Sequence, residues 1–334
     1  MKQPLVSIIL PTYNGEAFIA ESIDSILRQS YTDFELIIVD DCSTDKTTEI
    51  IASFTDQRIK VIRNNVNLNL PSSLNIGHSV SCGKYLTWTS DDNILKSAFL
   101  SELVASLIET HSDIAYSNFE VIDENNKFLR LEKIKPLYYV IFGNPVGASF
   151  LYTREVFERL HYREDLQGIE DYNFWIRASD NFTFTMLDKI LYKYRKHSNT
   201  LTSQISNSDV LRKNHLNKLE IALSDFVSFS NESKKILYGF QNRDVWNWGF
   251  YFQYRKSFLN EIKNWLSDKG YGCSYSEIRF EYLRHLRDLC FQESRSDFRI
   301  RAILEEPGIL FHPDFSVFRT LKFLCKAVFS KKNM

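Results

Sequence analysis

LIIVDD, residues 36–41, and YLTWTSDDN, residues 85–93, are the stretches that decide the fold of this chain. Each is a short apolar run followed by acids, and such runs are typical of buried parallel strands. In an open α/β sheet, ligands bind beyond the carboxyl ends of the parallel strands. We therefore expect the two acidic clusters to meet at one edge of one sheet.

The acids that close the second stretch predict a metal site. Carboxylates that are crowded together repel one another unless a cation or hydrogen-bond donors satisfy them. A hard divalent cation that also holds a diphosphate meets this need. We predict Asp92 as the direct ligand, with Asp91 nearer to a ribose. A polar turn before the next helix is the alternative, and it explains Asn93 but not two adjacent acids.

Strand-like and helix-like segments alternate around these two stretches. Repeated strand–helix units indicate an α/β protein with a mainly parallel, doubly wound sheet flanked by helices. The predicted strands are 6–10, 34–39, 59–63 and 85–89, and the predicted helices are 16–29, 47–54, 71–80 and 97–110.

The pattern changes after residue 113, where short strands and a single helix replace the regular alternation. From about residue 208 the chain is helical and rich in aromatic side chains. We therefore predict two parts, a sheet domain over residues 1–203 and a helical region over residues 204–334. The expected later strands are 114–117, 119–122, 128–131, 148–152, 182–187 and 190–194, and the expected helix is 171–179.

Composition excludes several classes of protein. The 334 residues carry a formal net charge of −1, which argues against nucleic-acid binding. Residues 1–200 have a net charge of −7 and residues 201–334 one of +6, so the second part suits an anionic partner. Five cysteines without CxxC spacing favour a reducing compartment. No apolar stretch approaches the ~18 residues that span a bilayer, so we expect a cytoplasmic protein.

Two loops near the acidic clusters predict contacts with a nucleotide. In PTYNG, residues 11–15, the ring of Tyr13 and free backbone N–H groups can face a base and a ribose. An ordinary strand–helix turn is the alternative. Asp41 can accept from a uracil N3–H or from ribose hydroxyls, and Ser43 or Asp45 can cap the next helix at the same time.

Two later motifs predict a base and an anion contact. In GIED, residues 168–171, an acid at a helix N-terminus is held ionised, so Asp171 can take a proton from an attacking hydroxyl, with Glu170 beside it. The ordinary preference for acids at that position is the alternative. Near residue 195, His197 can contact a metal or phosphate, and Arg195 can bind phosphate, unless this is a solvated basic loop.

The C-terminal tail predicts a helix with one apolar and one basic face over residues 317–332. A helix of this kind can lie on an anionic membrane surface. A terminal helix docked on the protein body is the alternative. We favour the membrane, which would place the protein peripherally on the cytoplasmic face.

The ordered set PTYNG, VDDCSTD, NIG, GKY, SDDN and GIED resembles the family 2 glycosyltransferases, which have the GT-A fold. The resemblance is strong over residues 4–110 and looser over residues 145–203. Order and spacing agree as well as content, which makes the set specific. Residues 204–334 lie outside the resemblance.

The resemblance implies a role for each matching residue. It implies that Asp171 is the base of an inverting displacement and that Mn²⁺ or Mg²⁺ is the cofactor. The remaining assignments are Pro11, Tyr13 and Asp41 in the uracil site, Asp91 at the ribose, Asp92 on the metal, and His197 on the metal or a phosphate.

Two positions depart from the family pattern. Ser90 stands where many members have the first acid of Asp-x-Asp, and Leu74 stands where many have an arginine. The phosphate contact must then come from elsewhere, and Arg195 and Lys196 are the candidates.

The resemblance implies transfer of a hexosyl or N-acetylhexosaminyl group from a UDP-sugar to a hydroxyl of a lipid-linked glycan, in surface polysaccharide synthesis. Transfer to a polyprenyl phosphate is an alternative that needs no base. A non-catalytic partner in glycan assembly is another, which Ser90 and Leu74 allow. A dinucleotide-dependent oxidoreductase is disfavoured because the first strand–helix turn lacks GxGxxG.

Overall fold

The first four strands form the parallel part of the sheet. A computed structural model describes residues 5–269, 275–293 and 295–311. Within them, nine strands form one sheet in the order β3-β2-β1-β4-β8-β6-β9-β5, with β7 beside β6. All three pairings among the first four strands are parallel. Their bounds are β1 Val6–Thr12, β2 Phe34–Asp40, β3 Ile59–Arg63 and β4 Tyr85–Trp88.

The remaining strands extend the sheet with mixed directions. β8 runs antiparallel to both β4 and β6, whereas β6 and β9 are parallel. β6 and β9 are each one long strand where we predicted two short ones. Their pairing shifts register near residues 117–119, and such a bulge interrupts the period-two pattern that the prediction used. The bounds are β5 Ile94–Leu95, β6 Ile114–Ile122, β7 Phe128–Glu132, β8 Phe150–Thr153 and β9 Phe184–Arg195.

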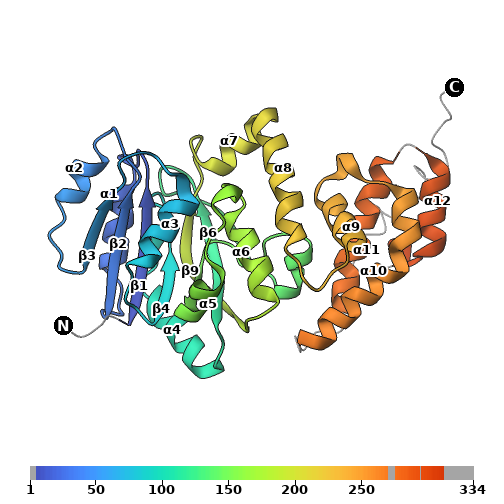
Figure 1. Ribbon diagram of the computed structural model, residues 1–334, viewed down its shortest axis with the longest axis horizontal. Coiled ribbons are helices and arrows are strands. Elements are labelled where there is room, and N and C mark those ends of the chain that lie inside the picture. The colour runs from blue at the N-terminus through green and yellow to red at the C-terminus, as the bar shows by residue number, and fades with distance from the viewer. Residues whose placement is uncertain (1–4, 270–274, 294, 312–334) are drawn as a thin grey trace. The chain divides into compact units, whose positions relative to one another are not determined.

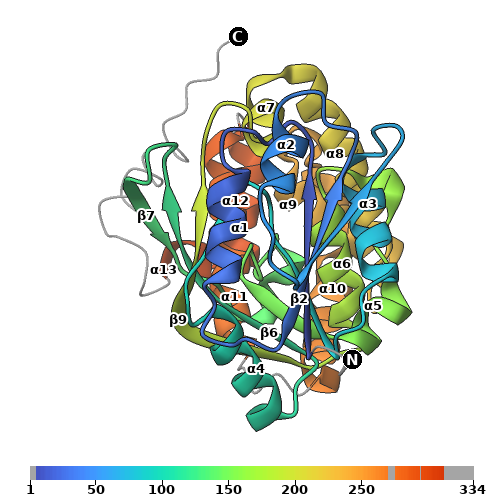
Figure 2. The same ribbon diagram turned by 90° about the vertical axis from the view of Figure 1, so that its left-hand side faces the viewer.

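Helices cover both faces of this sheet (Figure 2). One face packs against α1 and α4, with Ile8 and Leu36 among the buried residues. The other face packs against α3, where a Cβ on Gly77 would come within 2.6 Å of Ile9. The helices are α1 Ile19–Leu27, α2 Thr47–Ala52, α3 Asn69–Ser79, α4 Phe99–Thr110, α5 Arg154–Leu160 and α6 Glu170–Ser179, with 3₁₀ turns at Leu137–Ile141 and Glu164–Leu166.

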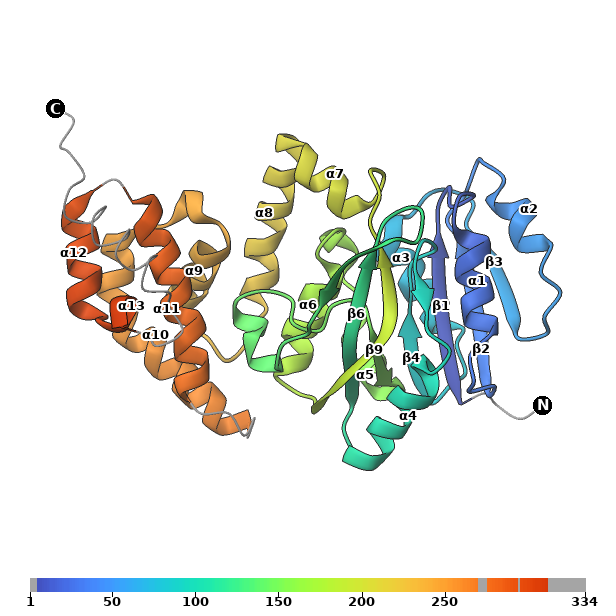
Figure 3. The same ribbon diagram turned by 180° about the vertical axis from the view of Figure 1, so that it is seen from behind.

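The chain divides into two compact units, residues 1–225 and 226–334 (Figure 1). By this division α7 and α8 belong to the first unit, whereas the boundary that we predicted at residue 203 falls within α7. The described part of the second unit is helical (Figure 3). Buried aromatic rings fill much of its interior. The helices are α7 Leu201–Asn207, α8 Asp209–Ser224, α9 Asn231–Gln241, α10 Trp248–Lys269, α11 Tyr275–Gln292, α12 Ser296–Glu305 and α13 Gly308–Phe311, with a 3₁₀ turn at Arg243–Val245.

The predicted α/β class is confirmed, including the helical C-terminal region. Its parallel character belongs to the first four strands and to the β6–β9 pair. Among the described helices, none combines the length and the apolar composition needed to cross a membrane. The predicted amphipathic helix over residues 317–332 lies outside the described residues.

Candidate active site

The ends of β1 and β4 meet at Asp91. The Thr12 hydroxyl, in the last residue of β1, donates a hydrogen bond to the Asp91 carboxylate. A Cβ on Gly15 would collide with the same carboxylate, so only glycine lets the loop after β1 approach it this closely. Burial, with the adjacent Asp92 charge adding to it, raises the pKa of Asp91 to about 7. The Asp41 N–H donates to the carbonyl oxygen of the same Thr12 at 2.8 Å, so the two acidic clusters lie at one edge of the sheet, on either side of the end of β1.

Asp92 is held beside His197 and keeps one carboxylate oxygen free. His197 Nε2 lies 3.1 Å from Asp92 Oδ2. Asp92 Oδ1 is buried and has no hydrogen-bond partner in the described part of the chain. A buried carboxylate oxygen without a donor and a neighbouring imidazole fit a divalent cation. No cluster of three or more His, Cys, Asp or Glu ligands surrounds it among the described residues, so further ligands must come from a bound diphosphate or water.

Arg195 is buried beneath this pair and supports it. Its Nε donates to the Asp92 carbonyl oxygen at 2.8 Å, and its Nη2 donates to Glu21 at 2.6 Å. Its Nη1 faces two more carbonyl oxygens, and the guanidinium stacks on Phe18 at 4.6 Å. Because these donors are already engaged within the protein, the geometry does not favour the phosphate contact that we predicted for Arg195. The exposed Lys196 stays a candidate for that contact.

The acids at the end of β2 are engaged by the chain itself. Asp41 Oδ1 accepts from the Asn64 side chain and the Leu68 N–H, and Oδ2 accepts from the Asn69 N–H. Each carboxylate oxygen has two acceptor positions, so one position on Oδ2 stays open for a ligand. The carboxylate thus orders the loop that precedes α3, and its contact with uracil stays a prediction.

The two predicted uracil residues on β1 differ in exposure. Pro11 is buried inside the strand, in register with Val39. Tyr13, just beyond the strand, is 49% exposed, so its ring is free to pack against a base. The loop between them and α1 is tied to the β2 end, because the Asn14 N–H donates to Ser43 Oγ at 3.0 Å.

Asp171 lies at the start of α6 and receives two hydrogen bonds. Asn144 Nδ2 donates to Asp171 Oδ2 at 2.9 Å, and the Tyr172 N–H donates to Oδ1 at 2.6 Å. Burial raises the pKa of Asp171, and these hydrogen bonds oppose that rise by favouring the ionised form. Glu170 accepts from the Gly168 N–H, and burial with the Asp171 charge raises its pKa to about 7.

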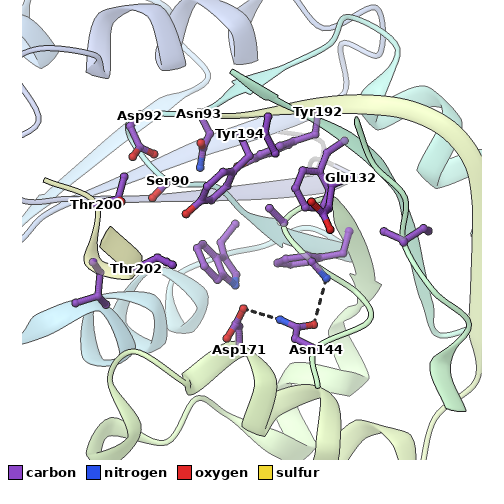
Figure 4. Close-up of a pocket in the computed structure, with 18 of the residues that line it drawn as sticks. Ser90, Asp92, Asn93, Glu132, Asn144, Asp171, Tyr192, Tyr194, Thr200 and Thr202 are labelled. Atoms are coloured by element: carbon purple, nitrogen blue, oxygen red, sulfur yellow. Dashed lines mark hydrogen bonds between the residues drawn. The ribbon is translucent and has the colours of Figure 1, made fainter. Parts of the chain in front are cut away.

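Asp92 and Asp171 point into one cavity of about 490 Å³ (Figure 4). Volumes of this order are typical of small-molecule sites. The cavity is also lined by Ser90 and Glu170, whereas Tyr13, Asp41, Asp91 and His197 lie outside its lining. Aromatic side chains form much of its wall, and they are Trp88, Phe119, Phe150, Tyr192 and Tyr194.

The sequence analysis did not reveal the contacts of three side chains at the site. Thr12 and Asn144 each donate to a predicted site carboxylate, and Tyr194 lines the cavity that Asp92 and Asp171 share. Asn144 stands before Pro145, a pair typical of turns, which was its only local signal. Their partners are 27 or more residues away in sequence, so no spacing rule reveals the contacts.

Comparison with known proteins adds a family and a fold. The family model "Glycosyl transferase family 2" matches residues 7–186. An uncharacterized glycosyltransferase of Haemophilus influenzae is 32% identical over 256 residues, which are 68% of this chain and 79% of that protein. Uncharacterized glycosyltransferase EpsJ of Bacillus subtilis is 36% identical over 218 residues, which are 60% of this chain and 63% of that protein.

Solved structures of S. aureus TarS share the architecture. TarS (1–349) in complex with UDP-GlcNAc superposes with a TM-score of 0.59 at 19% identity, over 78% of this chain and 80% of that one. TarS (1–349) in complex with UDP gives a TM-score of 0.55 at 18% identity, over 85% and 80%. At these identities the likeness shows the fold, and the predicted GT-A fold is confirmed.

Proposed function

This chain belongs to glycosyl transferase family 2, and on that premise we propose that it moves a sugar from a UDP-sugar to a hydroxyl of a growing glycan, with inversion. Glycosyl transfer is the activity of the family, and the donor, the acceptor and the stereochemistry are our proposal. One observation carries it: a single cavity is lined both by Asp92, which has an unpartnered buried oxygen, and by Asp171 at a helix N-terminus.

The donor end of the site is at the ends of β1, β2 and β4. The half-exposed ring of Tyr13 would pack on the uracil, beside the strand residue Pro11, and the open position on Asp41 Oδ2 would accept from it. Asp91 would accept from a ribose hydroxyl. TarS, which shares the fold, has been solved in complexes with UDP-GlcNAc and with UDP, which supports a UDP-sugar donor of the hexosyl or N-acetylhexosaminyl class.

Asp92 and His197 would hold Mn²⁺ or Mg²⁺ together with the diphosphate. A bound divalent ion offsets the negative charge that develops on a departing diphosphate. Arg195 fixes the backbone that carries Asp92, and Phe18 packs against both Arg195 and His197. The exposed Lys196 would meet a phosphate oxygen. Buried, hydrogen-bonded residues thus hold the two proposed metal ligands, Asp92 and His197, in place.

Asp171 would accept the proton of the acceptor hydroxyl as that oxygen attacks the anomeric carbon. Asn144 orients it, because Asn144 Oδ1 accepts from the Val146 and Gly147 N–H groups at 3.1 and 3.2 Å and its amide must then face Asp171. Attack from the face opposite the leaving group turns an α-linked donor into a β-linked product. Glu170, the neighbouring acid in the cavity lining, accepts a hydrogen bond from the Gly168 N–H.

The acceptor that we propose is a lipid-linked glycan in surface polysaccharide synthesis, met at the cytoplasmic face of a membrane. The net charge of +6 over residues 201–334 supports an anionic surface as a partner of that part of the chain.

A donor screen tests the proposal. The protein is incubated with UDP-, GDP- and CDP-sugars in the presence of Mn²⁺, and release of the nucleoside diphosphate is measured. We expect release from at least one UDP-sugar, and loss of that release in Asp92→Ala. Release from GDP- or CDP-sugars alone would overturn the donor class. Retained transfer in Asp171→Asn would point to a polyprenyl phosphate acceptor. Failure of the wild type to bind any nucleotide would instead point to a non-catalytic partner.

A further inference from the structure

A short basic segment lines the cavity within an otherwise acidic part of the chain. Residues 1–200 have a net charge of −7, yet residues 127–135 contain four cations and one acid. Three of the cations line the cavity, and we call Arg130, Lys133 and Lys135 the basic rim. The fourth, Lys127, lies outside the lining.

The basic rim lies across the sheet from the proposed metal pair. Tyr194 on β9 is in register with Val121 on β6, and Val121 is in register with Arg130 on β7. Neighbouring strands are about 4.8 Å apart, so Arg130 lies roughly 10 Å from β9, the strand that leads to His197. Figure 4 likewise shows Glu132 of β7 on the side of the cavity away from Asp92.

Buried side chains anchor the backbone that carries the two lysines. Asn118, which is 4% exposed, accepts the Ile134 N–H at 3.0 Å on its Oδ1. The buried Tyr116 hydroxyl donates to the Lys135 carbonyl oxygen at 3.0 Å. The lysine side chains therefore project from a fixed backbone, which lowers the entropy lost when they bind a ligand.

The same backbone leads directly to Asp171. The Lys135 N–H donates to the Pro145 carbonyl oxygen at 3.4 Å, and the preceding residue, Asn144, donates to Asp171 at 2.9 Å. A molecule whose hydroxyl reaches Asp171 can thus place a neighbouring group at the rim. Asp92, Glu170 and Asp171 also line the cavity, so its acidic and basic side chains together orient such a molecule.

The cations of the rim are exposed. The Arg130–Glu132 ion pair, at 3.0 Å, is exposed on both sides, and exposed pairs contribute little free energy. The Lys135 ammonium lies 4.6 Å from the centre of the Tyr139 ring. Lys133 is exposed. All three side chains are therefore accessible to an anion in the cavity.

We propose that the basic rim binds a carboxylate or phosphate group on the acceptor, so that the enzyme selects an anionic glycan. This inference rests on the proposed function, because it takes the cavity beside Asp171 as the acceptor site. The aromatic wall packs against the sugar rings, and the basic rim binds the anionic group that they carry.

Binding of matched disaccharides tests the rim without requiring turnover. Calorimetry with UDP and Mn²⁺ present compares cellobiose with cellobiouronic acid and cellobiose 6′-phosphate, which add one carboxylate or one phosphate. We expect at least one anionic probe to bind about tenfold more tightly than cellobiose, with a preference that falls as salt is raised. The stronger of the two identifies the anion.

Three variants separate the rim from general charge. Lys133→Ala/Lys135→Ala should reduce the preference to less than about threefold, and Lys133→Glu/Lys135→Glu should reverse it. Lys127→Ala, in the same hairpin but outside the cavity, should leave it unchanged. These positions are exposed, so the variants should fold as the wild type does.

Equal binding of the three probes, or binding of none by protein that still binds UDP, would overturn the proposal. An equal loss of preference in Lys127→Ala would do the same. UDP binding is measured in the same experiment. Its absence alongside an intact, lysine-dependent anion preference would remove the proposed donor and leave the anion site standing.

Discussion

Two acidic pairs follow neighbouring parts of the same sheet, and their surroundings differ. Asp40 is the last residue of β2 and Asp41 follows it. The chain itself supplies hydrogen-bond donors to each of their carboxylate oxygens. Asp92, after β4, keeps a buried oxygen without a donor in the described part of the chain. The first pair therefore mainly organises loops and leaves a ligand one open position on Asp41 Oδ2, whereas the second retains binding capacity for a cation.

Acids at the end of a strand can therefore bind a ligand where the fold supplies no hydrogen-bond donor to their carboxylate oxygens. The Asp40 carboxylate accepts hydrogen bonds from the Ser43 N–H, the Thr48 hydroxyl and the Arg63 guanidinium. The arginine nearest to Asp92, Arg195, instead binds the Asp92 carbonyl oxygen and leaves the carboxylate open. Substitutions at Asp92 and Asp41 should therefore separate effects on activity from effects on stability.

Asp92→Ala should produce the largest loss of activity. We expect turnover to fall by about 10³-fold, because the proposed metal loses its main ligand. The midpoint of thermal unfolding should stay within about 2 °C, since His197 is the one side chain in the described part of the chain whose hydrogen bond with the Asp92 carboxylate is lost. Steady-state kinetics and a thermal melt on the same sample measure both. Near-normal turnover would remove Asp92 from the mechanism.

Asp171→Asn should reduce turnover by about 10²-fold and leave UDP affinity unchanged. The amide keeps the shape of the side chain but cannot take the acceptor proton. The matched control is Glu170→Gln, next to it on α6, which should change turnover only a few-fold. If both variants lost activity equally, the local structure rather than the base would be responsible.

Asn144→Ala should lower turnover about tenfold and move the pH profile. Burial raises the pKa of Asp171, and the Asn144 amide stabilises the ionised form and opposes that rise. Removing the donor raises the pKa further, so the acidic limb of the rate profile should shift to higher pH. A uniform loss of rate at every pH would show a structural role only.

Asp41→Asn should have the smallest effect on catalysis and a clear effect on stability. An amide nitrogen would face the N–H groups of Leu68 or Asn69, so buried hydrogen bonds are lost, at a cost of about 1–3 kcal/mol. In a domain of this size each kcal/mol lowers the unfolding midpoint by about 2–4 °C. Asp24→Asn, at an exposed ion pair, is the control and should change little. An unchanged melt would contradict a structural role for Asp41.

The sequence predicted best where a single strand carries the signal. The four parallel strands and the acids at the ends of β2 and β4 lie where local patterns placed them, and α6 begins at Glu170, one residue before the expected start. Apolar runs followed by polar residues reveal buried strands because both faces of a parallel sheet are covered.

What the sequence could not show depends on partners far apart in the chain. The pairing of Asn144 with Asp171 and the engagement of Arg195 by Glu21 join residues separated by 27 and 174 positions. The basic run around Arg195 predicts an exposed cation, yet the Arg195 side chain is only 1% exposed. Only the folded chain shows which charges are already satisfied.

Calorimetric titration of UDP, with and without Mn²⁺, into wild type, Asp92→Ala and Asp41→Asn tests the central claim most directly. The account predicts Mn²⁺-dependent binding in the wild type, its loss in Asp92→Ala, and binding within a few-fold of wild type in Asp41→Asn. Binding that is independent of Mn²⁺ and equal in wild type and Asp92→Ala would contradict it.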